Sequence, residues 1–119
     1  MNKRSVGTEY ENRACEYLYN MGYKILMTNF RNRFGEIDII ASDNDYLVFI
    51  EVKYRKNLAV GSPAEAVNLK KQISICRVSD FYRIRYGVSP DTNIRYDVVA
   101  ISDNSISLIK NAFEYIGPA

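Results

Sequence analysis

Hydrophobic residues recur at helical spacing near the start of the chain. Apolar side chains stand at positions 6, 10, 14, 17, 18 and 21, which is the spacing of one face of an α-helix. Gly22 follows, and glycine commonly ends a helix because it accepts a left-handed backbone conformation. This pattern predicts a helix from about Val6 to Met21.

Three stretches rich in β-forming residues come next, separated by polar turns. We expect strands over residues 23–31, 36–41 and 46–54, with a turn at Phe34-Gly35 and a four-residue polar loop over 42–45. Because so short a loop separates the second strand from the third, we expect these two strands to pair as a hairpin.

A second helix has a clearly marked start after a loop over residues 55–61. Ser62 suits the N-cap, Pro63 suits the first helical position, and Glu65 completes an S-x-x-E capping box. The helix is predicted to end near Tyr86, because a glycine comes directly after it.

Two shorter strands are predicted to close the domain, over residues 95–101 and 105–109. The predicted order is therefore α-β-β-β-α-β-β, with no linker, repeat or low-complexity stretch in residues 1–119. This order indicates a single α/β domain, in which a mixed β-sheet is flanked by helices.

The composition narrows the chemistry that this domain can perform. The chain contains no histidine, which excludes Ser-His-Asp and Cys-His catalysis and zinc sites built on histidine. It also contains no GxxxxGK[ST] or GxGxxG loop for a nucleotide phosphate. Cys15 and Cys76 lack the paired spacing of a zinc site or a disulfide framework. Carboxylate and lysine chemistry remains.

The chain shows no sequence signal for a membrane or for secretion. No apolar run approaches the ~18–20 residues that a membrane-spanning helix needs. The N-terminus is basic, but no apolar signal-peptide region follows it. We therefore expect a cytoplasmic protein that has no membrane partner.

Charge is distributed unevenly along the chain, although the net charge is only +2. Residues 36–51 contain five acidic and no basic groups, whereas residues 53–85 contain eight basic and two acidic groups. An acidic block beside basic flanks suits a protein that holds a divalent cation near a polyanion. A protein with an uneven surface charge and no such role would show the same pattern, so charge alone does not decide the function.

Carboxylates stand in the middle of the second predicted strand. Side chains two apart on a strand share a face and lie roughly 6.7 Å apart along it. Glu36 and Asp38 are therefore expected to point to one face, while Ile37 and Ile39 point to the other. Such charges are rarely placed within a strand that helices cover.

The third predicted strand repeats this arrangement. Glu51 and Lys53 are expected to share a face opposite Ile50 and Val52, and the hairpin can bring both close to Asp38. One interpretation is an exposed sheet face with cross-strand ion pairs. The other is a cation site, because Mg²⁺ prefers oxygen ligands, polarises a phosphate and lowers the pKa of bound water. A lysine beside such a site can orient that water.

The ordered set GEID, a short hairpin and EVK resembles the PD-(D/E)xK nuclease superfamily, with Ile37 where the superfamily name has proline. The chain resembles the UPF0102 family (YraN-like proteins) still more closely, and that family is similar to archaeal Holliday junction resolvases. This resemblance extends over the stretches GTEYENRACEYL, GEIDIIASDNDYLVFIEVKYR, GSPAEAV and RYDVVAI. It implies a restriction-endonuclease-like core, Asp38 and Glu51 as metal ligands together with the carbonyl of Val52, and Lys53 as the catalytic lysine. It also implies that the protein can form a homodimer.

Further candidates for this site come from the two helices and the second strand. Glu11 lies in helical phase with the apolar side of the first helix, so we expect it to face the metal; the alternative is a capping box with Thr8. Lys71 and Gln72 of the second helix either face the site or belong to a solvated helical face. Gln72 and Glu36 are accessory candidates.

Basic residues flank the acidic block and are interleaved with aromatic residues. The candidates for contacting phosphates are Arg31, Arg33, Arg55, Lys56, Lys70 and Lys71, and the aromatic residues among them are Tyr23, Phe30, Phe34 and Tyr54. Phosphate contacts supply affinity without reading sequence, and the chain has no helix-turn-helix or zinc-finger pattern that reads bases.

The sequence thus favours a Mg²⁺- or Mn²⁺-dependent endonuclease that hydrolyses phosphodiester bonds of nucleic acid, with DNA the expected partner and DNA repair or recombination the expected setting. The alternative is a nucleic-acid-binding module that keeps the nuclease fold without activity of its own. A protein-interaction adaptor fits less well, because an adaptor has no need for Asp38, Glu51 and Lys53 together.

Overall fold

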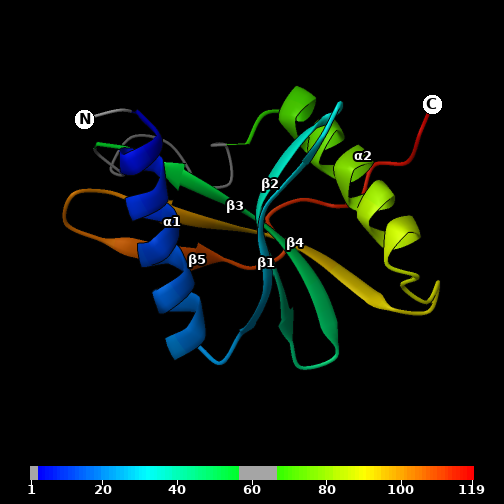
Figure 1. Cartoon of the computed structure of the whole chain (residues 1–119), viewed down its shortest axis with the longest axis horizontal. Coiled ribbons are helices and arrows are strands. Elements are labelled where there is room, and N and C mark those ends of the chain that lie inside the picture. The colour runs from blue at the N-terminus through cyan, green and yellow to red at the C-terminus, as the bar shows by residue number, and fades with distance from the viewer. Residues whose placement is uncertain (1–2, 57–66) are drawn as a thin grey trace.

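The computed structural model describes residues 3–56 and 67–119, with side chains from Glu9 onward. In these ranges the chain forms α1 (Lys3–Asn20), β1 (Lys24–Asn32), β2 (Gly35–Asp43), β3 (Tyr46–Tyr54), α2 (Leu69–Arg85), β4 (Asn93–Ile101) and β5 (Ile106–Ile109) (Figure 1). This order confirms the predicted succession α-β-β-β-α-β-β. Neither described helix is long and apolar enough to cross a membrane.

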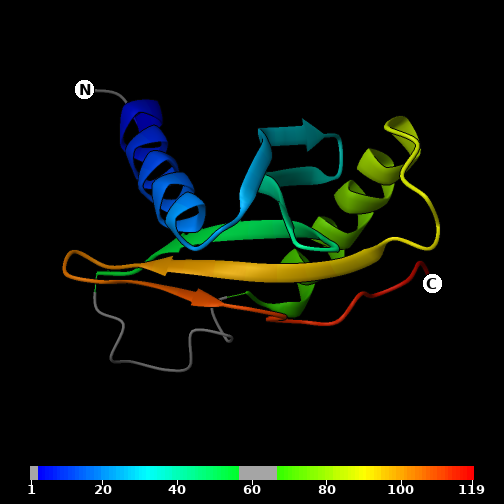
Figure 2. The same ribbon diagram turned by 90° about the horizontal axis from the view of Figure 1, so that it is seen from below.

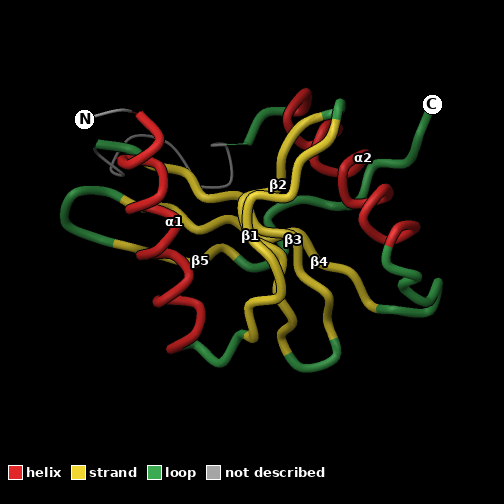
Figure 3. Tube along the Cα trace, in the orientation of Figure 1, coloured by secondary structure: helices red, strands yellow, loops and turns green. Residues whose placement is uncertain are grey.

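The five strands form one mixed sheet in the order β1-β2-β3-β4-β5. All neighbouring pairs are antiparallel except β3 and β4, which run parallel because the chain passes through α2 between them. The strands cross the centre of the molecule, with α1 to one side of them and α2 to the other (Figure 3). The predicted α/β fold, a mixed sheet flanked by helices, is therefore confirmed.

Each helix covers a core of its own. Ala14 and Leu18 of α1 are fully buried against one set of strand residues, Ile39, Ala41, Val48, Ile50, Val99 and Ile101. Ile75, Cys76, Val78 and Tyr82 of α2 pack against another set, which includes Ile37, Ile40, Phe49, Tyr96 and Val98. Burying a side chain of this size contributes about 1.5–3 kcal/mol, so both helices are held by apolar contacts rather than by intrinsic helix propensity.

Strand β2 bends between its two halves, which corrects one expectation from the sequence. Ile37 packs in the core beneath α2, whereas Ile39 packs in the core beneath α1. The prediction that these two side chains share a face is therefore wrong. Regular pairing of β2 with β3 extends only as far as Ile39, opposite Ile50. Beyond that point the β1–β2 hairpin rises off β3 and β4 (Figure 2).

The hairpin between β2 and β3 is confirmed, but its loop is shorter than predicted. Asp43 pairs with Tyr46, so only Asn44 and Asp45 form the turn rather than four residues. Asn44 has a φ of 54°, in the left-handed region that asparagine tolerates better than most residues. This tight turn fixes the register that brings the middle of β2 beside the middle of β3.

The predicted start of the second helix is also corrected. Ser62, Pro63 and Glu65 lie outside the described residues, and α2 begins at Leu69 with Asn68 as its N-cap. The Asn68 side chain accepts a hydrogen bond of 2.9 Å from the backbone of the third helical residue, which is a complete N-cap. A helix running without a break from Ser62 is therefore wrong. The predicted end is confirmed, because α2 ends at Arg85.

The motif RYDVVAI owes part of its composition to a buried polar network. Asp97 is fully buried and accepts hydrogen bonds from the Tyr23 hydroxyl (2.8 Å), Arg95 Nε (2.9 Å) and the backbone of Asn111 (2.9 Å). Arg95 also reaches Asp43 at 2.9 Å. Because every contact stays within the fold, this network ties the residue before β1, β2, β4 and the segment after β5 together and has a structural role.

Candidate metal centre

Asp38 lies where β2 parts from β3. The residues beyond Ile50 on β3 have no backbone partner on β2, and Val52 instead donates its N–H to Oδ2 of Asp38 at 2.8 Å. A carboxylate thus takes the place of a strand carbonyl. This contact holds the side chain of Asp38 against β3, at the residue that directly follows Glu51.

Three carboxylates converge at this point. Glu11, Glu36 and Asp38 each contribute an oxygen, and these oxygens lie within 4.8 Å of one another. Glu11 comes from α1 and the other two come from β2, so tertiary packing brings them together. The expectation that Glu36 and Asp38 project to the same side is confirmed, and so is the expectation that Glu11 faces Asp38. The Thr8 side chain of the alternative capping box lies outside the described side chains.

Asn29 holds Glu11 in this position and was missed in the sequence. Its Nδ2 donates to Oε2 of Glu11 at 2.8 Å, and its φ of 55° places it in the left-handed region. Its neighbours Thr28 and Phe30 pair with Ile39 and Ile37, which puts Asn29 opposite Asp38. The available signal was an asparagine in the middle of a strand, since asparagine is depleted in strands and enriched where φ is positive.

Glu51 faces the cluster from β3 with an oxygen that lacks a hydrogen-bond partner. Its side chain is 11% exposed, and its Oε2 atom is buried without a hydrogen bond among the described residues. The nearest cation is Lys71 of α2, whose Nζ lies 3.7 Å from that oxygen, which is too long for a hydrogen bond. Ile50 and Val52 pack in the α1 core, which is consistent with Glu51 and Lys53 pointing to the other side as predicted.

The site raises the pKa of both central carboxyls. Burial, followed by the charge of Glu51, raises the pKa of Asp38 to about 8, and the Val52 N–H offsets only part of this shift. Burial also raises the pKa of Glu51, against the lowering effect of Lys71 and Lys53. Crowded carboxylates in a partly dry site disfavour their own ionised forms. A hard divalent cation would relieve this repulsion, since carboxylate oxygens are the ligands that such cations prefer.

The basic candidates divide into two groups. Arg31 pairs with Glu36 at 3.4 Å and Lys71 lies beside Glu51, so these two cations already contact the acidic cluster. The exposed candidates lie around it: Arg33 in the β1–β2 turn, Arg55 and Lys56 after β3, and Lys70 in the first turn of α2. Lys53 is half-buried on β3. Gln72 donates to the carbonyl of Val67 at 2.9 Å, which occupies its amide nitrogen at the start of α2.

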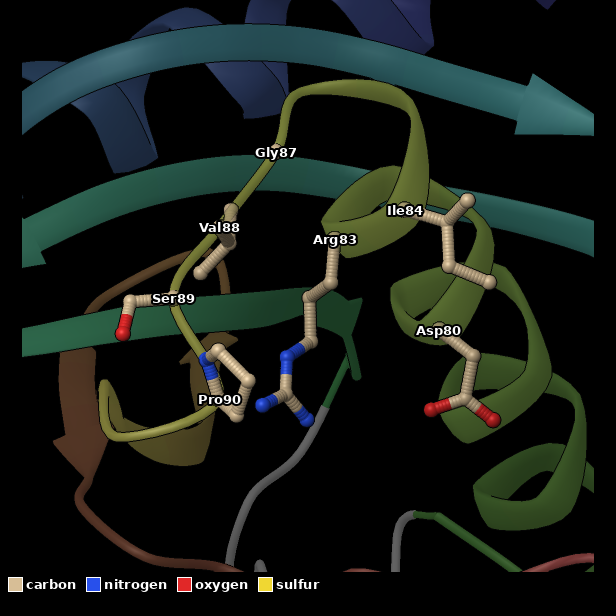
Figure 4. A pocket seen from close by; sticks show the side chains of 7 residues that line it. All are labelled: Asp80, Arg83, Ile84, Gly87, Val88, Ser89 and Pro90. Atoms are coloured by element: carbon tan, nitrogen blue, oxygen red, sulfur yellow. The ribbon is translucent and has the colours of Figure 1, made fainter.

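A separate hollow lies at the other end of α2. It has a volume of 520 Å³ and is lined by Asp80, Arg83, Ile84, Gly87, Val88, Ser89 and Pro90 (Figure 4). None of the converging carboxylates lines it. The chemistry suggested by the sequence therefore belongs to the carboxylate cluster and not to this hollow.

Comparison with known proteins gives a consistent match over the length of the chain. The model of the family described as "Uncharacterised protein family UPF0102" matches residues 10–101. A UPF0102 protein of Lachnoclostridium phytofermentans is 45% identical over 117 residues, covering 98% of this chain and 99% of the relative. One of Caldicellulosiruptor bescii is 48% identical, covering 95% of this chain and all of the relative. One of Persephonella marina is 44% identical, covering 91% and 92%.

Proposed function

This chain belongs to the UPF0102 family, and from that premise we propose that it is a Mg²⁺- or Mn²⁺-dependent nuclease that hydrolyses phosphodiester bonds of nucleic acid, with DNA as the expected substrate. The observation that supports the proposal is the convergence of three carboxylates, from α1 and β2, beside a buried oxygen of Glu51 on β3 that has no hydrogen-bond partner among the described residues. A buried oxygen that accepts no hydrogen bond is unusual in a folded protein, and a bound cation would give it a partner.

The residues present fit a hard divalent cation. The donors are carboxylate oxygens that lie close together, and Glu51 offers a buried oxygen that accepts no hydrogen bond among the described residues. Asp38, Glu51, the carbonyl of Val52 and Glu11 would hold the cation, with Glu36 beside them. Such a cation supplies polarisation of the scissile phosphate and a bound water of lowered pKa.

The protein's own groups supply position and charge. The Val52 N–H holds Asp38 in place, and Asn29 holds Glu11. Two of the proposed metal ligands are therefore oriented before the cation binds. Lys53 shares the face of Glu51, where its ammonium group would orient the attacking water and stabilise the negative charge that develops on the phosphate.

Substrate binding is assigned to the basic residues around the cluster. Arg33, Arg55, Lys56 and Lys70 are exposed and would contact phosphates, together with Arg31 and Lys71, which lie at the cluster itself. Contacts of this kind set affinity and position without reading bases, so shape rather than sequence would select the substrate. We place this activity in the cytoplasm, in DNA repair or recombination, and expect a homodimer if two strands are cut symmetrically.

The test is cleavage by the full chain and by a lysine variant. A panel of linear, nicked and flapped DNAs is incubated with Mg²⁺ or Mn²⁺, and Lys53→Ala is compared with wild type. The expected result is cleavage by wild type and loss of at least about 100-fold in rate for Lys53→Ala, because a positioned charge at the reacting phosphate is worth a few kcal/mol. Lys24→Ala serves as the control. It removes an exposed lysine at the start of β1, at the end of that strand away from the β1–β2 turn, and should cleave normally.

A second function is favoured by one observation, which is that two of the carboxylates already contact cations of the chain. Arg31 pairs with Glu36 at 3.4 Å and Lys71 lies 3.7 Å from Glu51. Internal neutralisation of this kind suits a nucleic-acid-binding module without activity of its own. DNA binding without cleavage of any substrate, and without any effect of Mn²⁺ on affinity, would favour that function over the nuclease.

A further inference from the structure

The tip of the β1–β2 hairpin presents a large apolar side chain to solvent. Arg33 and Phe34 form the turn between the paired residues Asn32 and Gly35, and Phe34 is 46% exposed. Turn positions are normally occupied by glycine, asparagine, aspartate or proline, each for a conformational reason that phenylalanine does not meet. Phe34 therefore serves neither the turn nor the core, and its exposure calls for another explanation.

The backbone of this tip is held in place from two sides. The Asn32 side chain accepts a hydrogen bond of 2.8 Å from the Phe34 N–H, and the Phe34 carbonyl accepts one of 2.6 Å from the Ser74 hydroxyl of α2. Gly35 allows this approach, because a Cβ at that position would lie 2.3 Å from Ser74 Oγ. The tip lies beside the first turns of α2 (Figure 1). Phe34 is thus presented by a pinned backbone, which lowers the entropy cost of binding through it.

Positive charge surrounds this aromatic ring. The Arg33 guanidinium lies over the Phe34 ring, 4.9 Å from its centroid, and Arg31 on the same hairpin is 66% exposed on its side chain. Lys70 and Lys71 are exposed on α2, one turn before Ser74. An exposed aromatic ring among cations is complementary to a ligand that has both phosphates and flat aromatic faces, which is the chemistry of nucleic acid.

The other aromatic residues among the basic candidates are engaged within the fold. Tyr23 is 2% exposed and bonded to Asp97. Phe30 packs edge-on against Tyr82, with ring centroids 5.4 Å apart. Tyr54 stacks on another tyrosine of α1 and donates to a carboxylate after β4. Of these four residues, Phe34 is the one whose ring projects from a turn.

We propose that Phe34 stacks on an unpaired base of nucleic acid bound across the β1–β2 hairpin and the start of α2. In a duplex the bases already stack on one another, so a base is available to Phe34 only in single-stranded nucleic acid or in a single-stranded segment. Since Arg33 covers one face of the ring, the base occupies the opposite face. This inference rests on the proposed function for the identity of the ligand and adds the substrate class to it.

The spacing along β2 connects this contact with the carboxylate cluster. Asp38 follows Phe34 by four residues, so the two residues are separated by at most about 14 Å. Even at the duplex spacing of ~3.4 Å for each nucleotide, about four nucleotides would cover that distance, so the carboxylate cluster would lie within a few nucleotides of the stacked base.

The experiment measures binding of the full chain in Ca²⁺, which usually supports binding at such sites without cleavage. The probes are a single-stranded DNA with a 2-aminopurine base and a fluorescein label, and a blunt duplex of the same length. Wild type is expected to bind the single strand more tightly and to change the 2-aminopurine fluorescence. Phe34→Ala should weaken single-strand binding by about 5- to 150-fold, the factor that one stacked base contributes, and leave duplex binding unchanged. Phe34→Tyr should bind as wild type.

A matched variant separates stacking from charge. Arg33→Ala should weaken binding to both probes and reduce the dependence of affinity on salt, because it removes a phosphate contact. Phe34→Ala should keep the wild-type salt dependence. Phe34→Leu retains an apolar side chain without a ring, so it should fold normally and still lose the 2-aminopurine response. If Phe34→Ala were to fold poorly, the Leu variant would give the decisive comparison.

The possible outcomes separate this inference from the function on which it rests. Equal single-strand affinity and equal fluorescence response in wild type, Phe34→Leu and Phe34→Ala would overturn the inference while leaving the nuclease proposal intact. Phe34-dependent binding together with no cleavage of any DNA in Mn²⁺ would support the inference and overturn the proposed catalysis. Absence of any binding by wild type to either probe would overturn both.

Discussion

Replacement of Asp38 by asparagine should stabilise the protein without metal and should reverse that effect when metal is present. The carboxyl of Asp38 has its pKa raised to about 8, from an ordinary value of 3.8, by burial and by the charge of Glu51. Above pH 4 the unfolded chain loses this proton, while the folded protein keeps it until about pH 8. The folded state then binds more protons than the unfolded state, so stability falls as the pH rises through this window.

The size of the effect follows from the shift. At ~1.36 kcal/mol for each pKa unit, the full shift of Asp38 corresponds to at most about 6 kcal/mol. The expected gain for Asp38→Asn is smaller, about 1–3 kcal/mol at pH 7.5, because solvent screens a partly exposed group and the new amide is itself a polar group that must be desolvated. The amide oxygen can still accept the hydrogen bond from Val52, so the geometry is preserved.

The assay is thermal and urea unfolding of both proteins in EDTA, at pH 4.5 and pH 7.5, and again at pH 7.5 with Mn²⁺. The variant should be more stable in EDTA at pH 7.5, with a midpoint higher by about 4 °C for each kcal/mol, and the difference should shrink at pH 4.5. Mn²⁺ at ~100 times its Kd should stabilise wild type by about 2.7 kcal/mol and the variant by less. Asp91→Asn, in an exposed loop, is the control for loss of one negative charge and should change stability by less than about 0.5 kcal/mol.

The opposite result would show that Asp38 is part of a structural contact. If the variant were less stable than wild type in EDTA at pH 7.5, and if Mn²⁺ stabilised neither protein, the carboxylates would not be repelling one another and the metal proposal would fail. A loss of about 1–3 kcal/mol is the value expected for breaking a buried polar contact.

Two other contacts give direct tests. Asn29→Gly keeps the backbone conformation at φ 55° but deletes the amide that holds Glu11, so it should weaken Mn²⁺ binding by about 10- to 100-fold in calorimetry; affinity equal to wild type would show that Glu11 needs no support. Gly35→Ala should destabilise the fold by about 1–3 kcal/mol in urea unfolding, and Ser74→Ala in the same chain should restore part of the loss because it removes the clashing hydroxyl; unchanged stability would mean that the hairpin tip moves freely away from α2.

Local patterns in the sequence were sufficient to predict the helices and strands. They also predicted which side chains share a face in the helices and strands that are regular. The period of two along β3 correctly separated Glu51 and Lys53 from Ile50 and Val52, because that strand stays regular along β4. The helical phase of α1 likewise placed Glu11 on the same side as its buried residues. Such patterns work where a strand or helix has one uniform environment along its length.

Features that depend on long-range packing could not be predicted from local sequence patterns. The bend that sends Ile37 and Ile39 to different cores depends on the approach of the hairpin to α2, and no local period records it. The position of Asn29 opposite Asp38 depends on register and on a positive φ. The start of α2 was misjudged because a strong capping box at Ser62 competes with an equally good N-cap at Asn68, and sequence alone does not rank the two.

Anomalous diffraction from crystals soaked in Mn²⁺ would show directly whether these carboxylates form a divalent-cation site. We expect an anomalous peak about 2.0–2.6 Å from oxygens of Asp38 and Glu51, and no peak at that position in crystals of Asp38→Asn. Well-ordered density at saturating Mn²⁺ with no peak there, and with Lys71 still beside Glu51, would contradict it.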